Sequence, residues 1–286
     1  MQWQDYPGLF QSADHTATIR EKWHFWSLKG FLVVLAAGAF LSLFPDTEKW
    51  AAITAAVLFF LGIGFSLLMA FMRFDRSWYN ARAVAESVKT RTWRFMMQAD
   101  PYHTEDGKAR ELFAEDIGCI LKDNQEAIKI IPALNRLTIT DEMNRVRALS
   151  LSDRKLFYKN HRVDDQLNWY IRQAAFNKRH NVGWVILMIL FQIGALACVL
   201  VKLSHPEITP VPTALFTTLA GTTLSWTQAK RFGELSTSYN LTAHDISQIS
   251  INYTALSEEQ GFSSFVRDSE AAFSREHIQW IARRGI

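Results

Sequence analysis

The chain lacks the short motifs through which many enzymes hold metals, phosphates or nucleophiles. It has only two cysteines, Cys119 and Cys198, which are too few and too far apart for a thiolate zinc site or a disulfide framework. It has no glycine-rich phosphate loop and no His-Glu-x-x-His pair, and its eight histidines are scattered. We therefore expect no enzymatic activity, no bound metal and no cofactor.

A strong excess of charge is also absent. The formal net charge of +3 is too small to indicate nucleic acid as a partner. Alternating strand patterns are almost missing, which favours an all-α chain. The mean hydropathy of -0.04 resembles that of a soluble protein, but it averages very polar regions with very apolar ones.

Charge is missing from the middle of four apolar stretches, and this absence is the most informative one. The stretches are residues 27–44, 51–72, 182–203 and 208–226. Each approaches or reaches the ~20 residues that a helix needs to cross a bilayer. Only 45–50 and 204–207 separate the members of each pair, so the sequence predicts two antiparallel transmembrane hairpins with four spans in a lipid bilayer.

Lysine and arginine gather at one end of these hairpins. They precede the first and third stretches and follow the second and fourth, whereas the opposite ends offer only Lys49 and Lys202. By the positive-inside rule, both termini and the central segment face the cytoplasm. The first stretch lacks a cleavage site after it, so we expect it to remain as a span.

The polar regions show helical stripes of apolar residues. One stripe runs from Phe74 through Ala81, Ala85, Val88 and Phe95, and a shorter one includes Leu156, Val163 and Leu167. The strongest has heptad spacing and predicts coiled-coil-like packing, which makes its members candidates for assembly. These candidates are Phe232, Leu235, Tyr239, Ile246, Ile249, Tyr253 and Leu256.

The pattern of helix, hairpin and helix occurs twice, which divides the chain into two halves. The first half, 1–150, has the first two spans and cytoplasmic helices at 73–99 and 108–131. The second half, 151–286, has an entry helix at 151–179, the last two spans, and cytoplasmic helices at 227–258 and 262–283. The predicted fold is an all-α integral membrane protein whose spans continue into long cytoplasmic helices.

The fourth stretch carries a stripe of small and hydroxylated residues. Its members are Thr209, Thr213, Thr217, Gly221 and Ser225, with Thr218 and Thr222 beside them. Hydroxyl oxygens can replace the hydration water of an ion, but the same residues also pack membrane helices together. Gln192 in the third stretch needs a hydrogen-bond partner, or it joins this pore lining. Gly38 and Gly62 lie on small faces that favour close helix contact.

Three runs resemble a known family. They are residues 73–89 with Trp93-Arg94-Phe95, residues 158–179 with Arg162-Val163-Asp164-Asp165, and residues 265–270 with Trp280. They resemble SLATT domains, the SMODS- and SLOG-associating two-transmembrane effectors, and the likeness extends over two tandem units. The resemblance implies a bacterial inner-membrane effector of antiphage defence that opens pores when a nucleotide-signal sensor encoded elsewhere is triggered.

We therefore predict an oligomeric, pore-forming or channel-like effector. Four weakly polar spans do not enclose a water-filled path alone, so a homo-oligomer is expected, with gating through uninterrupted second and fourth spans. The alternative is a non-conducting membrane scaffold that docks a soluble partner. A third, weaker alternative is a lipid-active enzyme, for which the sequence provides no recognisable group of catalytic residues. The basic cluster at Arg145 and Arg147 is predicted to lie on a solvent-exposed face.

Overall fold

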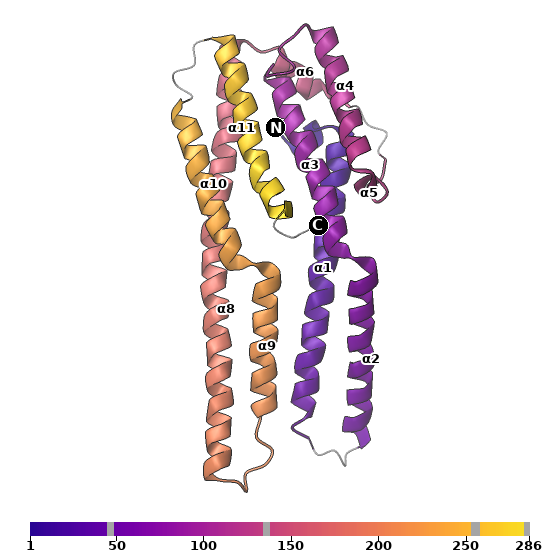
Figure 1. The fold of residues 1–286 in the computed structure, drawn as a ribbon, viewed down its shortest axis with the longest axis vertical. Helices are drawn as coiled ribbons and strands as arrows, with labels where there is room; N and C mark the ends of the chain where they lie inside the picture. Colours follow the sequence, from indigo (N-terminus) through magenta and orange to yellow (C-terminus); the bar gives the residue numbers. More distant parts are fainter. Residues whose placement is uncertain (45–48, 134–137, 253–257, 283–286) are drawn as a thin grey trace. The chain divides into compact units, whose positions relative to one another are not determined.

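The computed structural model describes residues 1–44, 49–133, 138–252 and 258–282, and every regular element in these ranges is helical (Figure 1). In chain order the elements are η1 (Trp3–Asp5), α1 (Gly8–Leu41), α2 (Lys49–Met72), α3 (Phe74–Met96), α4 (Asp106–Asp123), α5 (Gln125–Ile128), α6 (Asp141–Arg147), α7 (Leu151–Tyr158), η2 (Lys159–Val163), α8 (Asp164–Ser204), α9 (Thr213–Lys230), α10 (Phe232–Asn252) and α11 (Glu259–Ala282). The predicted all-α class is confirmed.

The chain forms two compact units, and each draws on both halves of the sequence. Unit 1 comprises residues 1–21, 75–173 and 238–286, and unit 2 comprises residues 22–74 and 174–237. Unit 2 holds the apolar hairpins, and unit 1 holds most of the polar helices.

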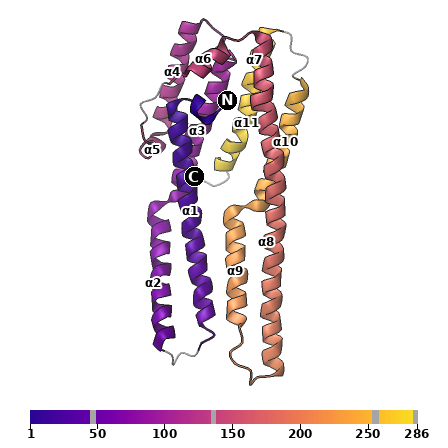
Figure 2. The same cartoon turned by 180° about the vertical axis from the view of Figure 1, so that it is seen from behind.

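In each hairpin of unit 2, a phenylalanine ring of the second helix packs against a glycine of the first helix. α1 lies beside α2, and α8 lies beside α9 (Figures 1 and 2). A Cβ atom on Gly30 would lie 2.4 Å from the ring of Phe65, and one on Gly194 would lie 2.9 Å from the ring of Phe216. Both contacts therefore need glycine on the first helix of the hairpin. Gly38 meets nothing within 4 Å in its own chain, so the predicted close contact at this residue is not made inside one subunit.

The second helix of each hairpin ends at an arginine in the left-handed conformation. Arg73 separates α2 from α3 with φ 40°, and Arg231 separates α9 from α10 with φ 54°. A side chain with a Cβ reaches this conformation only at a cost of about 1–2 kcal/mol, and it cannot continue a right-handed helix there. The predicted continuity of the second and fourth spans is wrong. The unbroken helices are the first members of the hairpins, α1 and α8.

Three helical stretches in the described residues are long and apolar enough to cross a membrane, namely 8–41, 49–96 and 151–204. α9 is not among them. The fourth span was predicted at 208–226, but residues 208–212 are not helical and α9 occupies Thr213–Lys230. Pro210 and Pro212 lie before the helix, and proline supplies no backbone N–H for an intrahelical bond.

Unit 1 has a continuous aromatic and aliphatic core. The stripe predicted on α3 faces it: Ala81, Ala85, Val88 and Phe95 are fully buried. The largest side chains that are fully buried are aromatic and come from several helices. They include Trp93, Phe95, Tyr102, Phe113, Tyr158 and Phe262.

A π-helical turn changes the buried face between α7 and α8. Leu156 was predicted to join the apolar stripe, but it is 57% exposed. The turn at η2 holds an extra residue relative to an α-helix, so the inward face shifts along the sequence. Arg154 and Tyr158 are buried on α7, and Arg162 is buried within η2.

Candidate functional site

One face of α9 is exposed and consists mainly of small or polar residues. Ala214, Thr217, Gly221, Ser225 and Gln228 are all exposed and recur every three or four residues, which places them on one side of the helix. A Cβ atom on Gly221 would meet nothing within 4 Å. This face is therefore open when the chain is considered alone.

The hydroxyl groups of this face are oriented by their own helix. The Thr217 hydroxyl donates to the carbonyl oxygens of Thr213 and Ala214, at 3.0 Å each. The Ser225 hydroxyl donates to the carbonyl oxygen of Gly221 at 2.9 Å. Each donor is thus satisfied inside the helix, while the lone pairs of each oxygen remain available to accept from water or to contact a cation.

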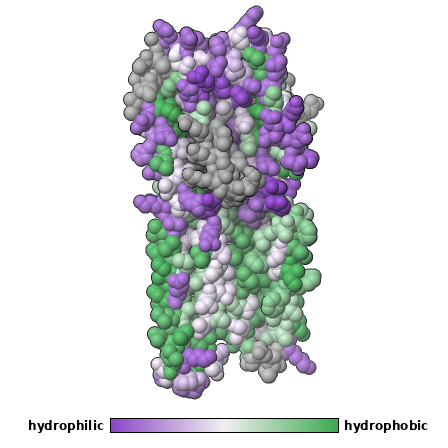
Figure 3. All heavy atoms as spheres, viewed as in Figure 1, coloured by the Kyte–Doolittle hydropathy of each residue, from purple (hydrophilic) through white to green (hydrophobic). Residues whose placement is uncertain are grey.

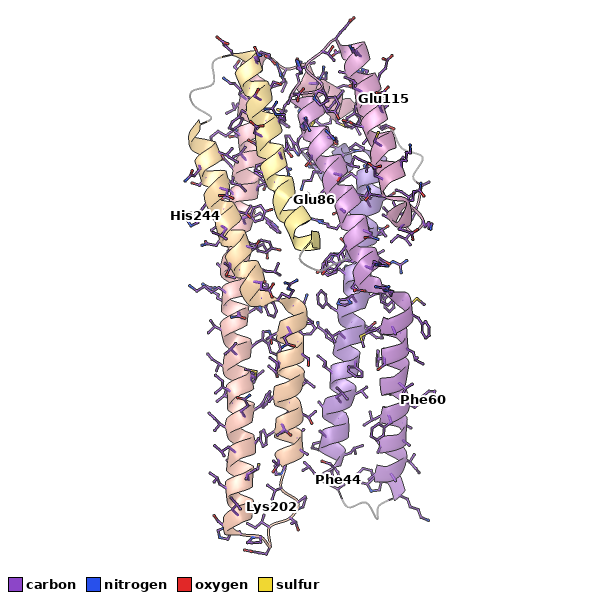
Figure 4. The ribbon with its side chains drawn as sticks, in the orientation of Figure 1. Phe44, Phe60, Glu86, Glu115, Lys202 and His244 are labelled. Carbon is purple, nitrogen blue, oxygen red and sulfur yellow. The ribbon has the colours of Figure 1, made fainter. Side chains whose placement is uncertain are left out.

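The exposed faces of the neighbouring helices have a different character. α2 and α8 expose many large apolar side chains, such as Phe60 at 76% and Leu190 at 57%, whereas within α9 only Leu224 is a large exposed apolar residue. Phe60 projects outward from α2 in Figure 4. In Figure 3 the surface over α9 is pale between greener surfaces. Lipid tails favour the large apolar faces, so the α9 face differs from a lipid-facing surface.

The residues predicted to line a pore are only partly brought together. Thr209 lies before α9 and is exposed, and Thr213 is the first residue of the helix. Thr218 and Thr222 are half-buried beside the open face. Gln192 is exposed on α8 and makes no side-chain hydrogen bond within the described residues, so the predicted partner in α9 is not found.

Gln228 extends the open face by one turn and was missed by the sequence analysis. Its spacing of seven residues from Gly221 was the available signal. Thr223, which is buried on the opposite side of α9, was missed as well, and its hydroxyl donates to the carbonyl oxygen of Leu219 at 2.7 Å.

The residues predicted for assembly divide into two groups. Phe232 and Ile246 are 7% and 1% exposed, so they contribute to the core of their own chain. Leu235, Tyr239 and Ile249 are half-buried, and their role in assembly stays a prediction. Tyr253 and Leu256 lie outside the described residues.

Unit 1 contains a buried ionic cluster. Arg162 and Glu270 are 2% and 0% exposed, and two guanidinium nitrogens of Arg162 donate to the two carboxylate oxygens at 2.8 and 2.6 Å. The Tyr158 hydroxyl donates to the same carboxylate at 3.0 Å. The guanidinium also lies over the rings of Trp93 and Phe273. The sequence analysis did not predict this cluster. The positions of the polar residues in the sequence do not indicate it, because it depends on the π-helical turn η2.

The environment of the cluster shifts several pKa values. Burial alone lowers the pKa of Arg162, but the carboxylate of Glu270 more than offsets this effect, so its pKa is raised. Burial and the negative charge of Glu270 raise the pKa of Tyr158 well above its usual value. Burial raises the pKa of Tyr6 to about 12, and its hydroxyl accepts a hydrogen bond from the Trp93 indole at 3.0 Å.

A second group of charged residues lies along α3. Glu86 pairs with Arg82 at 2.7 Å and with Lys89 at 4.0 Å, and both pairs lie within α3 at helical spacing. Arg82 also reaches Asp14 on α1 at 2.9 Å. Burial lowers the pKa of Lys89. Among the described residues, no group of three histidine, cysteine or acidic side chains is arranged to hold a metal ion.

These shifts predict a loss of stability in alkali. Tyr6 and Tyr158 have folded-state pKa values above the usual 10.0, so their contribution is complete below pH 10 and falls as pH rises toward the folded-state values. The loss is about 1.4 kcal/mol per pH unit for each tyrosine. Lys89 acts in the opposite sense, because its lowered pKa makes stability rise with pH up to about 10.5.

Tyrosinate absorbance and far-ultraviolet circular dichroism, followed together through a pH titration, measure this effect. We expect the ionisation of the buried tyrosines to coincide with unfolding above pH 10. Ionisation of every tyrosine near pH 10, with the helix content intact, would contradict the buried hydroxyl network.

Two family models match the chain in tandem. Residues 7–155 match SMODS and SLOG-associating 2TM effector domain 3, and residues 158–280 match SMODS and SLOG-associating 2TM effector domain 1. The first match includes α1 to α6 and the first part of α7, and the second includes α8 to α10 and most of α11. No curated protein and no solved structure matches the chain.

Proposed function

Because the chain belongs to the SLATT family of two-transmembrane effector domains, we propose that it is an oligomeric membrane pore of a bacterial antiviral defence system. Its place would be the inner membrane, with both termini in the cytoplasm. Its trigger would be a sensor protein of the SMODS or SLOG kind, encoded elsewhere. Membrane effector is the family property, and pore formation is our proposal.

The open face of α9 is the observation that carries this proposal. The second matched domain is described as having two transmembrane segments, and its range holds α8 and α9. We therefore infer that α9 is the fourth span. The outer face of α9 bears Thr217, Gly221 and Ser225 and one large apolar residue, Leu224. This face is therefore better suited to a neighbouring subunit or to water than the large apolar faces of α2 and α8 are.

The chemistry of this face suits a weakly selective cation path. The oxygens of Thr217 and Ser225 present lone pairs, because their protons are already donated to the helix backbone. α9 has no charged residue before Lys230, so no ring of charges would impose strong selectivity. Copies of α9 around a common axis would place these oxygens toward the axis.

Gating would use the contrast between the two members of each hairpin. α1 and α8 run without a break from unit 1 into unit 2, whereas α2 and α9 end at Arg73 and Arg231. A displacement in unit 1 is therefore transmitted along the unbroken helices. The two left-handed arginines would allow α2 and α9 to change direction independently of the helices that follow them.

Removal of the two hydroxyls tests the pore. We expect Thr217→Val with Ser225→Ala to lower ion flux in proteoliposomes, roughly fivefold for each lost oxygen contact of about 1 kcal/mol. The matched control is Thr54→Val with Ser66→Ala on α2, where both hydroxyls are also exposed and also donate to their own helix. The control should conduct like the wild type.

The particle mass in nanodiscs, measured for both pairs, separates the alternatives. A normal mass with reduced flux supports a pore lining. A reduced mass after the α9 changes would assign this face to packing between helices. Flux that is absent from the wild type in every activated state would leave the non-conducting scaffold as the function.

A further inference from the structure

One exposed side chain in the middle of the apolar part of α8 is polar. Gln192 is exposed, and it lies about ten residues, or roughly 15 Å, from either end of the apolar stretch 182–203. The helical stretch 151–204, which contains it, is long and apolar enough to cross a membrane. In a bilayer the Gln192 amide would therefore lie at the level of the lipid tails.

The hydrogen-bonding groups of Gln192 differ from those of the exposed hydroxyls of the hairpins. The Thr54 hydroxyl donates to the carbonyl oxygen of Trp50 at 2.8 Å, and the Ser66 hydroxyl donates to that of Gly62 at 2.9 Å, so these donors are satisfied by their own helix. The amide of Gln192 has two N–H donors and a carbonyl acceptor. None of them makes a hydrogen bond with a described residue. Lipid tails offer no partner either, so the amide needs water or a second protein surface.

Gln192 lies at the centre of an exposed stripe with heptad spacing, which we call the α8 stripe. Its apolar members precede and follow Gln192 at alternating steps of four and three residues, which places them on one side of the helix. α9 packs on a different side of α8, where Gly194 meets Phe216. The apolar members of the α8 stripe are 38% to 73% exposed, and they are Val185, Ile189, Leu196, Val199 and Leu203.

The amide distinguishes a protein partner from lipid as the cover of this stripe. A stripe of apolar residues alone would suit lipid tails as well as another helix. A glutamine in the middle of a span instead forms hydrogen bonds across the contact between two helices, because an unpaired amide is costly there. In coiled coils, a single polar residue within an apolar heptad stripe fixes the register of the paired helices. The α8 stripe has this composition.

A second copy of the chain supplies the matching group. An amide is both a donor and an acceptor, so two glutamine side chains can satisfy each other. Copies inserted in the same orientation place Gln192 at the same depth, because the distribution of lysine and arginine orients every copy alike. Two parallel α8 helices therefore bring their amides together without a shift in register. This step depends on the membrane placement and the homo-oligomer proposed above.

We propose that the α8 stripe is a contact between subunits, in which α8 packs in parallel against α8 of a second copy and Gln192 forms a hydrogen bond with Gln192 of the partner subunit. The apolar members of the stripe supply the packing, and the amides supply the register. The contact belongs to α8, so it uses none of the residues of the open face of α9.

Disulfide cross-linking of the full chain in membranes maps the contact. Cys119→Ser with Cys198→Ala first removes the two native thiols. Leu196→Cys then places a thiol on the α8 stripe, whereas Leu190→Cys places one outside it, at a similar depth and at a residue that is 57% exposed against 58% for Leu196. We expect oxidation to join the Leu196→Cys chains into dimers and to leave the Leu190→Cys chains single. Equal cross-linking of both variants, or none of Leu196→Cys, would overturn the proposal.

Removal of the amide tests the hydrogen bond, with self-association of the full chain in detergent measured by sedimentation equilibrium. We expect Gln192→Leu to weaken self-association by on the order of tenfold. Gln192→Asn keeps an amide and should weaken it less. The matched control is Ile193→Leu, a change of an apolar side chain that is 57% exposed but lies outside the α8 stripe, and it should associate like the wild type.

Circular dichroism of the same samples shows whether each variant keeps its helices. Wild-type association of Gln192→Leu, with a lower ion flux, would place the amide in water along a pore and would overturn the contact. Neither the cross-linking nor the self-association depends on conduction. A chain that pairs through α8 but conducts no ions would therefore reject the pore and retain this contact.

Discussion

Replacing Glu270 with alanine is expected to lower the free energy of unfolding of unit 1 by about 3–5 kcal/mol. The change leaves the guanidinium of Arg162 buried without its counter-charge, and it removes the acceptor of the Tyr158 hydroxyl. One nitrogen of that guanidinium, Nη1, already lacks a hydrogen-bond partner within the described residues. The guanidinium would then keep its positive charge in a buried place without the carboxylate that balances it.

Hydrogen exchange of α7, η2 and α11 in the full chain measures this loss, because local opening exposes their amides. Asp268→Ala is the control: it lies two residues from Glu270 on the same helix, but it is exposed, and among the described residues its ion pair is with Arg267. Its effect should stay within about 0.5 kcal/mol. The double change Arg162→Met with Glu270→Leu removes both charges and should recover most of the stability. Equal protection in Glu270→Ala and Asp268→Ala would show that the ion pair does not hold α11.

The hairpins could be predicted from the sequence because each of their helices contains many apolar residues in succession. Each apolar stretch is long, so an error of a few residues does not change the assignment. The stripe on α3 was also predicted correctly, since its residues are adjacent in one uninterrupted helix. The fourth stretch was placed too early, because its apolar composition continues through Pro210 and Pro212, where the helix has not begun.

The remaining features depend on events at single residues. The left-handed conformation of Arg73 and Arg231 breaks two helices that periodicity alone would continue, and arginine is not a typical residue for that conformation. The π-turn at η2 adds one residue, which turns Leu156 outward and Arg162 inward. Such local choices are set by tertiary contacts, so hydrophobic periodicity does not report them.

The α9 face was recognised in part for the same reason. A spacing of four residues correctly placed Thr217, Gly221 and Ser225 on one side of a helix. Spacing does not say which side is covered by the rest of the chain, and Thr218 and Thr222 lie on the half-buried side. Burial requires the partner helix, whose contact is set by Gly194 and Phe216.

Arg147 shows how composition misleads when a charged side chain is buried. The sequence favoured a solvated face for the basic cluster of α6, yet Arg147 is only 3% exposed. Its guanidinium donates to the carbonyl oxygens of Phe95, Tyr102 and Thr104 at 2.8 to 3.1 Å, and to the carboxylate of Asp106 at 2.8 Å. It therefore satisfies backbone acceptors at the end of α3 and in the segment that leads to α4.

We expect Arg147→Ala to destabilise unit 1 by at least about 3 kcal/mol, because it leaves several carbonyl oxygens without donors at about 1–3 kcal/mol each when they stay buried. Arg147→Lys should lower the stability almost as much, because a single ammonium cannot donate to all the acceptors that the planar guanidinium contacts. Arg145→Ala is the matched control on the same helix. Its side chain is exposed, pairs with Glu142 at 2.6 Å and lies 6.0 Å from the ring centroid of Phe157, so its loss should cost no more than about 1 kcal/mol.

Thermal unfolding of the three variants in the same detergent, followed by circular dichroism and by exchange of the α3 and α4 amides, gives the comparison. The predicted order of stability is wild type, then Arg145→Ala close below it, then Arg147→Lys and Arg147→Ala far below. If Arg147→Lys matched the wild type, the backbone contacts would not need the geometry of a guanidinium. If Arg145→Ala were as damaging as Arg147→Ala, charge on α6, rather than the buried contacts of Arg147, would account for the effect.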